Sequence, residues 1–317
     1  MALKRALFIA GPTASGKSAL SLRLAEDLNG VIINSDSMQV YRDLRVITAR
    51  PGKEEEAQAP HRLYGFLDGA EVCSAAFWAE RAVAEIEAAW QGGQTPIIIG
   101  GTGMYFKVLL DGIATIPDIP HDIRQMIRTR CAEEGSEMLH GELVAVDAAT
   151  AERLAPGDSQ RICRALEVYH ATGKPISMWQ ADTKPGPMKP CDDRGQVVKL
   201  VLDPPREVLY ERCDRRFDAM LEQGALDEVR TLMARGLDRS LPVMRSLGVP
   251  QLIAYLDGSL LFDEAREDAK MQTRRFAKRQ LTWFRNQFFS WQRLPAQLSE
   301  SQYRDFVNKN IKNPLTE

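Results

Sequence analysis

The eight residues Gly-Pro-Thr-Ala-Ser-Gly-Lys-Ser at positions 11–18 constrain this chain more than any other segment. They follow a short apolar run, Ala6–Ala10, and precede a helical pattern over residues 19–28. Glycines let such a loop turn tightly and point its N–H groups at an anion, and the helix that follows adds the positive end of its dipole. A strand, this loop and a helix in that order are typical of phosphate binding. We therefore expect a phosphorylated ligand.

The residue types within the loop suggest how the phosphate is held. Lys17 supplies a positive charge, and the hydroxyl of Ser18 is placed to hold Mg²⁺, the expected metal. The residues expected to bind the diphosphate or nucleotide are Gly11, Pro12, Thr13, Ala14, Ser15, Gly16, Lys17 and Ser18.

Length and composition limit the class of protein. At 317 residues with a net charge of −2, the chain exceeds one typical domain and shows no overall bias towards an acidic partner. Its 5 cysteines are scattered and form no Cys-x-x-Cys pair, which fits a reducing cytoplasm. The start, Met1–Ala10, resembles a signal peptide, but its apolar run is too short, and no run reaches membrane-spanning length.

Apolar runs alternating with helical patterns predict an α/β fold with a parallel sheet flanked by helices, as in P-loop NTPases. The expected strands are 6–10, 31–34, 63–67, 96–100 and 197–202. Residues from about 116 to 180 hold amphipathic helical segments only, which predicts an all-helical lobe inserted before the last core strand. We draw the boundaries as 1–113 for the first part of the core, 114–196 for the lobe, and 197–317 for the last strand and the C-terminal helices.

The second expected strand leads into Asp36. In an open parallel sheet, residues at the carboxyl ends of strands face the ligand. Asp36 should therefore lie near the phosphate loop, where a carboxylate can accept a proton, hold metal-bound water, or cap the next helix. Gln39 and Tyr41 favour a functional role, because an amide and an aromatic ring together can recognise a flat base.

A second glycine-rich turn, Gly100–Tyr105, follows the fourth expected strand. Thr102 within it could reach a phosphate or a metal, and a purely structural turn is the alternative. With the first loop and Asp36, this turn indicates one shared pocket.

Basic residues gather in two regions. Between Ala269 and Ser299 there are 7 basic residues and no acidic one, on a helix whose apolar stripe we expect to include Phe288 and Trp291. A helix that carries only positive charges is typical of contact with a phosphate backbone, and a solvated basic face is the alternative. In the inserted lobe, Arg161 and Arg164 share one face of a helix, where RNA contact or surface ion pairs are both open. Trp283 could be a core residue or a base-stacking one.

A further helix, expected over 206–223, carries Arg212, Arg215 and Arg216. An arginine that entered the pocket would clamp a diphosphate through two hydrogen bonds, which Lys17 cannot do.

Taken together, these motifs closely resemble those of the bacterial tRNA dimethylallyltransferase (delta-2-isopentenylpyrophosphate transferase) family. The resemblance covers nearly the whole chain and rests on GPTASGKS at 11–18, DSMQVY at 36–41, APHRL at 59–63, GGTGMY at 100–105, QRICRALEVY at 160–169 and KRQLTWFR at 278–285.

The resemblance implies transfer of a dimethylallyl group from dimethylallyl diphosphate to N6 of an adenosine beside the tRNA anticodon. It implies that the loop holds the donor's diphosphate and that Asp36, Thr102 and Arg216 are catalytic, with Asp36 as general base. The partners would be a tRNA anticodon stem-loop and the donor. The scattered cysteines and the lack of a membrane-spanning run predict a cytoplasmic enzyme that binds no membrane, and we expect a monomer because an enzyme that encloses one stem-loop has no evident need to dimerise. The tRNA-binding residues it implies are Asp36, Ser37, Met38, Gln39, Gly101, Arg124, Gln160, Arg161, Ile162, Cys163, Arg164, Arg245, Gly248, Lys278, Arg279, Gln280, Thr282, Trp283 and Arg285.

The chemistry agrees with this assignment, because an adenine N6 amine is a poor nucleophile that needs a proton acceptor. One segment departs from the family pattern: where we expect an aromatic side chain near Gly248, this chain has Val249 and Pro250.

Two other functions use the same loop. A P-loop kinase of a nucleotide or small metabolite would need the loop, the metal and Asp36 equally, but not the basic helices. An RNA-binding NTPase switch would need a Walker-B-type acid at the end of a further strand, and the sequence holds no clear one.

Overall fold

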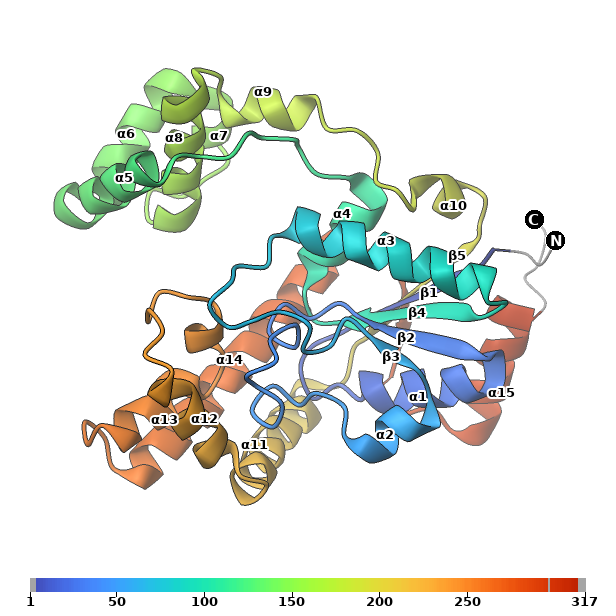
Figure 1. Ribbon diagram of the computed structural model, residues 1–317. Helices are drawn as coiled ribbons and strands as arrows, with labels where there is room; N and C mark the ends of the chain where they lie inside the picture. Colours follow the sequence, from blue (N-terminus) through green and yellow to red (C-terminus); the bar gives the residue numbers. More distant parts are fainter. Residues whose placement is uncertain (1–3, 296, 313–317) are drawn as a thin grey trace. The chain divides into compact units, whose positions relative to one another are not determined.

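The computed structural model describes residues 4–295 and 297–312, and its core is one parallel sheet (Figure 1). The strands run in the order β3-β2-β4-β1-β5-β6, and every neighbouring pair is parallel. Their bounds are Ala6–Ala10 for β1, Gly30–Asn34 for β2, His61–Arg62 for β3, Thr95–Gly100 for β4, Val197–Leu202 for β5 and Gln292–Leu294 for β6. All residues of β1 and β2 are buried, as expected for a sheet covered on both faces.

Helices cover the two faces of this sheet. On one face, α1 (Lys17–Leu28) and α15 (Glu300–Val307) bury Leu24 and Phe306 against the strands, and α3 (Ala75–Gln91) covers the opposite face (Figure 1). On α3, the fully buried Trp78 donates its indole N–H to the Asn34 carbonyl at 2.9 Å. This bond connects α3 to the end of β2, where the chain enters the expected site.

Among the remaining helices of this part, α4 packs on the sheet, where the ring of its Phe106 lies 5.7 Å from that of Phe8 in β1. The long helix α14 packs against α11 and α13, and α13 packs against α12. The bounds are Lys53–Gln58 for α2, Gly103–Asp111 for α4, Lys189–Asp193 for α10, Arg206–Glu222 for α11, Ala225–Ala234 for α12, Val243–Arg245 for η1, Val249–Leu256 for α13, Phe262–Gln287 for α14 and Asn308–Lys312 for η2.

The chain divides into two compact units, one of residues 1–109 and 188–317, the other of residues 110–187. The second unit is helical throughout its secondary structure and has its own apolar core, in which Ile127, Leu139, Leu143 and Leu166 are fully buried. Its helices are α5 (His121–Glu134), α6 (Ser136–Val146), α7 (Ala148–Ala151), α8 (Ser159–Thr172) and α9 (Ile176–Ala181). The lobe expected at 114–196 includes α10, whereas α10 belongs to the first unit.

The parallel α/β class is confirmed, and two details of the strand prediction were wrong. The strand expected at 63–67 is absent, because Leu63 and Gly65 adopt φ values of 62° and 54° that turn the chain after β3. The strand expected to be last, β5, is followed by β6. β6 has only three residues, and two of their side chains are exposed, so its sequence lacks the apolar alternation that predicts a strand.

No helix in the part of the chain that the structure describes is long and apolar enough to cross a membrane.

Candidate active site

The phosphate loop follows β1 as the sequence predicts. Gly16, at φ 94°, is the N-cap residue before α1, and Ala14 also has positive φ at 60°. A Cβ on Gly11 would lie 2.9 Å from Ser15 Oγ and 3.1 Å from Leu202 Cβ, so the loop is tightly packed against the end of β5. The loop residues from Thr13 to Ser18 line a cavity of about 130 Å³, with Asp36 and Arg216 on its other walls.

Lys17 lies in this cavity and is held by its own loop. Its ammonium donates to the Pro12 carbonyl at 2.6 Å. Burial lowers the pKa of Lys17 to about 8, the nearby Asp36 carboxylate partly opposes this shift, and the Arg216 guanidinium adds to it. An anion bound in the cavity would favour the charged form of Lys17.

Asp36 lies at the end of β2 and does not cap a helix, because the next helix of the structure, α2, begins at Lys53. Its Oδ1 accepts from the Met38 N–H at 2.9 Å, which closes a turn within the loop. The Asn34 Oδ1 accepts from the Asp36 N–H at 2.9 Å and fixes the backbone. Asp36 lines both the phosphate-loop cavity and the larger cavity beside it, so its carboxylate lies between the two.

The second glycine-rich turn lies against the Asp36 loop. The Ser37 N–H donates to Thr102 Oγ1 at 3.0 Å, and the Thr102 hydroxyl bonds to Ser37 Oγ at 3.2 Å. Gly100 allows this approach, since a Cβ there would lie 2.0 Å from the Ser35 carbonyl oxygen. Thr102 therefore positions the segment next to Asp36, and it also lines the larger cavity.

The larger cavity encloses about 300 Å³ and is lined by both polar and apolar side chains. Thr13, Asp36, Thr102 and Arg216 are among the polar ones. The apolar side chains come from the loop after β2, from α11, from the segment after η1 and from α14; they are Met38, Ile47, Phe217, Met220, Leu247 and Phe276. Such a cavity suits a flat or branched apolar group joined to an anion.

Arg216 is the arginine of α11 that enters the site. It donates to Thr13 Oγ1 and lines both cavities, and burial lowers the pKa of its guanidinium. Arg215 instead lies 3.6 Å from Glu211 on the exposed side of α11. Arg212 faces a separate cavity on the outer side of the phosphate loop.

The expected base-recognition role of Tyr41 was wrong. Tyr41 is 1% exposed, and its hydroxyl accepts from the Cys73 N–H at 3.4 Å. Gln39 lies at the phosphate-loop cavity, but its side-chain NH₂ donates to the carbonyls of Thr48 and Ala49, both at 2.8 Å. Both side chains hold loops in place, and periodicity could not show this because their partners lie in other segments.

On α14, the structure separates the expected RNA-binding residues into three kinds. Gln280 is buried and bonds to both glycine-rich turns, at Thr13 and Gly101. Trp283 is half-buried and packs on its neighbours: a Cβ on Gly103 would lie 1.8 Å from its ring, and its ring centroid lies 5.0 Å from that of Phe288. Thr282 is exposed.

Some basic residues of this region form ion pairs within the protein. Four are paired with aspartates of the same unit: Lys270 with Asp218 at 2.9 Å, Arg274 with Asp214 at 2.6 Å, and Arg285 and Arg293 with Asp203 at 2.9 and 3.1 Å. Arg275, Lys278 and Arg279 are exposed, and no ion pair is found for them among the described residues. The apolar stripe also ends earlier than expected, because α14 stops at Gln287, and Phe288 and Trp291 stack on each other beyond it.

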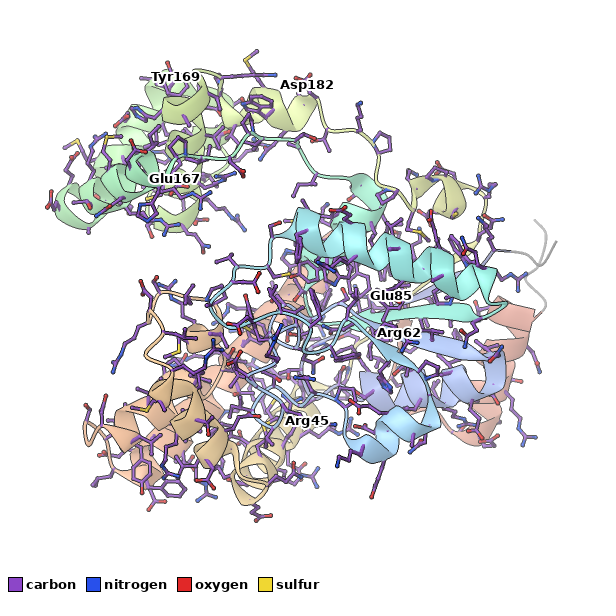
Figure 2. All side chains as sticks on the ribbon, in the orientation of Figure 1. Arg45, Arg62, Glu85, Glu167, Tyr169 and Asp182 are labelled. Atoms are coloured by element: carbon purple, nitrogen blue, oxygen red, sulfur yellow. The ribbon has the colours of Figure 1, made fainter. Side chains whose placement is uncertain are left out.

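In the helical unit, α8 begins with an Asp158 cap that accepts from the Arg161 N–H. Ile162 and Cys163 point into the core of the unit, so only their backbone could face a ligand. Arg161 and Arg164 line a cavity of about 420 Å³ with Arg153. Glu167, labelled in Figure 2, is buried beneath them and lies 3.7 Å from Arg164 and 3.3 Å from Arg128.

The other residues expected to bind RNA have varied surroundings. Gln160 is exposed on α8, and Arg124 on α5 has a buried Nε for which no hydrogen-bond partner is found among the described residues. Arg245, Ser246, Ser37 and Met38 all line the larger cavity, and the Ser246 hydroxyl donates to Met38 Sδ at 3.2 Å. Gly248 is buried with φ 87° at the start of α13, and a Cβ there would lie 2.8 Å from Phe217, so only glycine fits this position without strain.

Sequence reasoning missed Glu228 on α12. Its carboxylate accepts from the backbone N–H groups of Arg45, Val46 and Ile47 at 2.5, 3.0 and 2.9 Å (Arg45 is labelled in Figure 2). These bonds hold the segment that supplies Ile47 to the cavity wall. No local signal marks Glu228, because it resembles any acid in the first turn of a helix.

The oxygen atoms of the site fit a Mg²⁺ ion that is bound mainly by the phosphate oxygens of a ligand. No group of three or more His, Cys, Asp or Glu side chains within residues 4–295 and 297–312 could hold a metal ion. Magnesium commonly uses one or two protein oxygens together with phosphate oxygens and water. Ser18 and Asp36 at the phosphate-loop cavity provide such oxygens.

The sheet, the phosphate loop after β1 and the polar ends of the adjacent β4 and β2 define a P-loop-type α/β enzyme. The family model described as IPP transferase matches residues 39–287, and the chain belongs to this family. It is 52% identical over 290 residues to a tRNA dimethylallyltransferase of Rhodopseudomonas palustris, covering 91% of this chain and 89% of the relative. It is 50% identical over 306 residues to one of Rhodospirillum rubrum, covering 95% and 93%.

Solved structures agree with this placement. A tRNA isopentenylpyrophosphate transferase of Bacillus halodurans is 32% identical, with a TM-score of 0.68 and coverage of 96% of this chain and 95% of that one. A eukaryotic dimethylallyltransferase described as acting on tRNA is 28% identical, with a TM-score of 0.77 and coverage of 98% and 77%. The protein is thus a prenyl-transferring enzyme of tRNA modification, and the kinase alternative is not favoured.

Proposed function

We propose that the protein transfers a dimethylallyl group from dimethylallyl diphosphate to N6 of the adenosine beside the anticodon of tRNA. The observation that carries this proposal is the position of Asp36, which lines both the phosphate-loop cavity and the larger, partly apolar cavity. A diphosphate in the first and a prenyl group with a flat base in the second would meet beside this carboxylate. Membership in the IPP transferase family supports the same reaction.

The phosphate loop and Arg216 hold the donor in this scheme. Backbone N–H groups of the loop, Lys17 and Arg216 bind the diphosphate, whose negative charge grows as the carbon–oxygen bond breaks. These groups are fixed before the reaction, so they stabilise the leaving group most in the transition state. Mg²⁺, held by Ser18 and the diphosphate oxygens, would neutralise part of the same charge.

Asp36 acts on the acceptor. The adenine N6 amine becomes a nucleophile when its proton is accepted as the new carbon–nitrogen bond forms, and the Asp36 carboxylate takes that proton. The Met38 N–H and the Asn34 amide fix the Asp36 loop, and Thr102 fixes its neighbour Ser37. Hydrogen bonds to backbone and side chains therefore direct the carboxylate into the cavity.

The RNA would contact this unit through the exposed cations Arg275, Lys278 and Arg279 and through Arg245, and the helical unit through Arg161 and Arg164. The target base has to leave its stack to reach a buried carboxylate, which suits an unpaired loop nucleotide. The enzyme would act as a monomer in the cytoplasm, where its tRNA substrate is found.

The test is transfer of isotope-labelled dimethylallyl from its diphosphate to an anticodon stem-loop RNA in the presence of Mg²⁺. We expect label on N6 of the adenosine beside the anticodon. A stem-loop with guanosine at that position should remain unlabelled, and ATP should not be consumed in a parallel reaction without donor. Absence of label together with ATP hydrolysis would contradict the proposal.

A further inference from the structure

One side chain of α14 bonds to both glycine-rich turns of the site. Gln280 accepts the Thr13 N–H through Oε1 at 2.9 Å and donates through Nε2 to the Gly101 carbonyl at 2.9 Å. The residue is 7% exposed, so both bonds are shielded from water. A single primary amide thus joins the phosphate loop after β1 to the turn after β4.

The packing around Gln280 fixes where this amide lies. A Cβ on Gly101 would approach Nε2 to 2.2 Å, so the amide rests directly on the glycine backbone. On the same helix Ala277, Leu281 and Phe284 are buried, which sets the rotation of α14 about its axis. The amide therefore has little freedom to turn towards any other partner.

Each of the two bonds leads to a functional group. Thr13 donates its backbone N–H to Gln280, and its hydroxyl oxygen accepts a hydrogen bond from the Arg216 guanidinium. Gly101 directly precedes Thr102, which accepts from the Ser37 N–H next to Asp36. Gln280 is thus linked on one side to the diphosphate-binding groups and on the other side to the proposed base.

We infer that Gln280 is a positioning residue that sets the separation between the diphosphate-binding loop and Asp36. The inference rests on the proposed function and departs from the RNA contact implied by family resemblance, since both polar atoms of the amide are engaged within the protein. Transfer requires the reacting carbon and nitrogen to approach within about 3–3.5 Å, and a displacement of about 1 Å can lower the rate about 10²-fold.

The test compares two substitutions at Gln280 with a matched control. Gln280→Met keeps the length of the side chain and removes both bonds, and Gln287→Met makes the same change at an exposed glutamine of the same helix. We expect Gln280→Met to lower kcat by about 10²-fold and to weaken binding of inorganic pyrophosphate, measured by calorimetry. Affinity for the stem-loop RNA should stay near that of Gln287→Met.

Gln280→Glu adds a readout that a merely structural role would not change. A protonated carboxyl can accept from Thr13 and donate to Gly101 as the amide does, whereas the carboxylate faces the Gly101 carbonyl without a proton. The ratio of kcat for Gln280→Glu to kcat for wild type should therefore rise as the pH falls. This variant also serves if Gln280→Met fails to fold.

Loss of RNA affinity with unchanged kcat in Gln280→Met would overturn the inference and make Gln280 an RNA contact. A kcat equal to that of wild type, or a pH-independent loss in Gln280→Glu, would overturn it as well. If wild type transfers no dimethylallyl group, the proposed function fails. Pyrophosphate affinity then still decides whether Gln280 positions the loop, because that readout needs no transfer.

Discussion

At the scale of single residues, the placement of Asp36 leads to a direct test. Asp36→Asn keeps an oxygen that can accept from the Met38 N–H, so the turn should persist. It removes the proton acceptor, and we expect kcat to fall about 10²- to 10⁴-fold. Single-turnover transfer to the stem-loop RNA measures the effect. Affinity for that RNA should remain near wild type, and a variant that turns over normally but binds RNA poorly would contradict the assignment of Asp36 as base.

Lys17 gives a second residue-scale prediction, based on pH. Burial lowers its pKa to about 8 in the free protein, so the ammonium is charged below that pH and neutral above it. Lys17→Met should weaken pyrophosphate binding about 10- to 100-fold at pH 7, and the difference from wild type should shrink as the pH rises through 8. Calorimetric titrations of both proteins between pH 6.5 and 9.5 would measure this. If the ratio of the pyrophosphate affinities of wild type and Lys17→Met stays constant over this range, Lys17 does not titrate there.

At the scale of elements, α14 combines surface cations with cations that are internally paired. Lys278→Ala should weaken RNA binding and reduce the slope of log affinity against log salt by about 0.7–0.9, as expected for one lost phosphate contact. Arg274→Ala should leave that slope unchanged, because Arg274 is paired with Asp214, and should lower stability by about 1 kcal/mol or less. Fluorescence anisotropy over a range of salt tests both. Equal slopes for Lys278→Ala and wild type would remove Lys278 from the RNA surface.

The contact between the start of α4 and α14 gives another element-scale prediction. Gly103→Ala would place a Cβ 1.8 Å from the Trp283 ring, and we expect a loss of about 1–3 kcal/mol from overpacking. Gly141→Ala in α6 is the comparison, because nothing lies within 4 Å of its Cβ position. That change should stabilise the helix by about 0.5–1 kcal/mol. Calorimetry would measure the free energy of unfolding of both variants. A Gly103→Ala protein as stable as wild type would show that Trp283 moves aside at little cost.

At the scale of the whole molecule, the helical unit forms an insertion whose two ends are adjacent. The Met188 N–H donates to the Leu109 carbonyl at 2.8 Å, so a short glycine linker can replace residues 110–187. The shortened protein should fold and bind pyrophosphate like wild type, because the residues that line the phosphate-loop cavity all lie in the first unit. It should lose RNA affinity and transfer. Unchanged RNA affinity would mean that the helical unit does not contribute to binding.

Local patterns predicted much of the fold because their signals lie within a few residues. The phosphate loop at 11–18 depends on its own glycines and on a strand and helix next to it. The range predicted for β5 agrees with the structure for the same reason. By contrast, β6 and the turn at Leu63 depend on distant packing and backbone conformation, which no local pattern marks.

The parallel α/β class, the phosphate loop and a helical insertion can be predicted from residue order, since hydrophobic periodicity and glycine spacing are local patterns. Which polar groups are paired within the protein depends instead on the folded arrangement of distant segments. Lys270, Arg274 and Arg285 look like Lys278 in the sequence, yet aspartates from elsewhere in the chain pair with them. Gln280 and Glu228 likewise bond to segments far away in the chain. The physical reason is that hydrogen bonds and ion pairs depend on distance in space, which residue order alone does not specify.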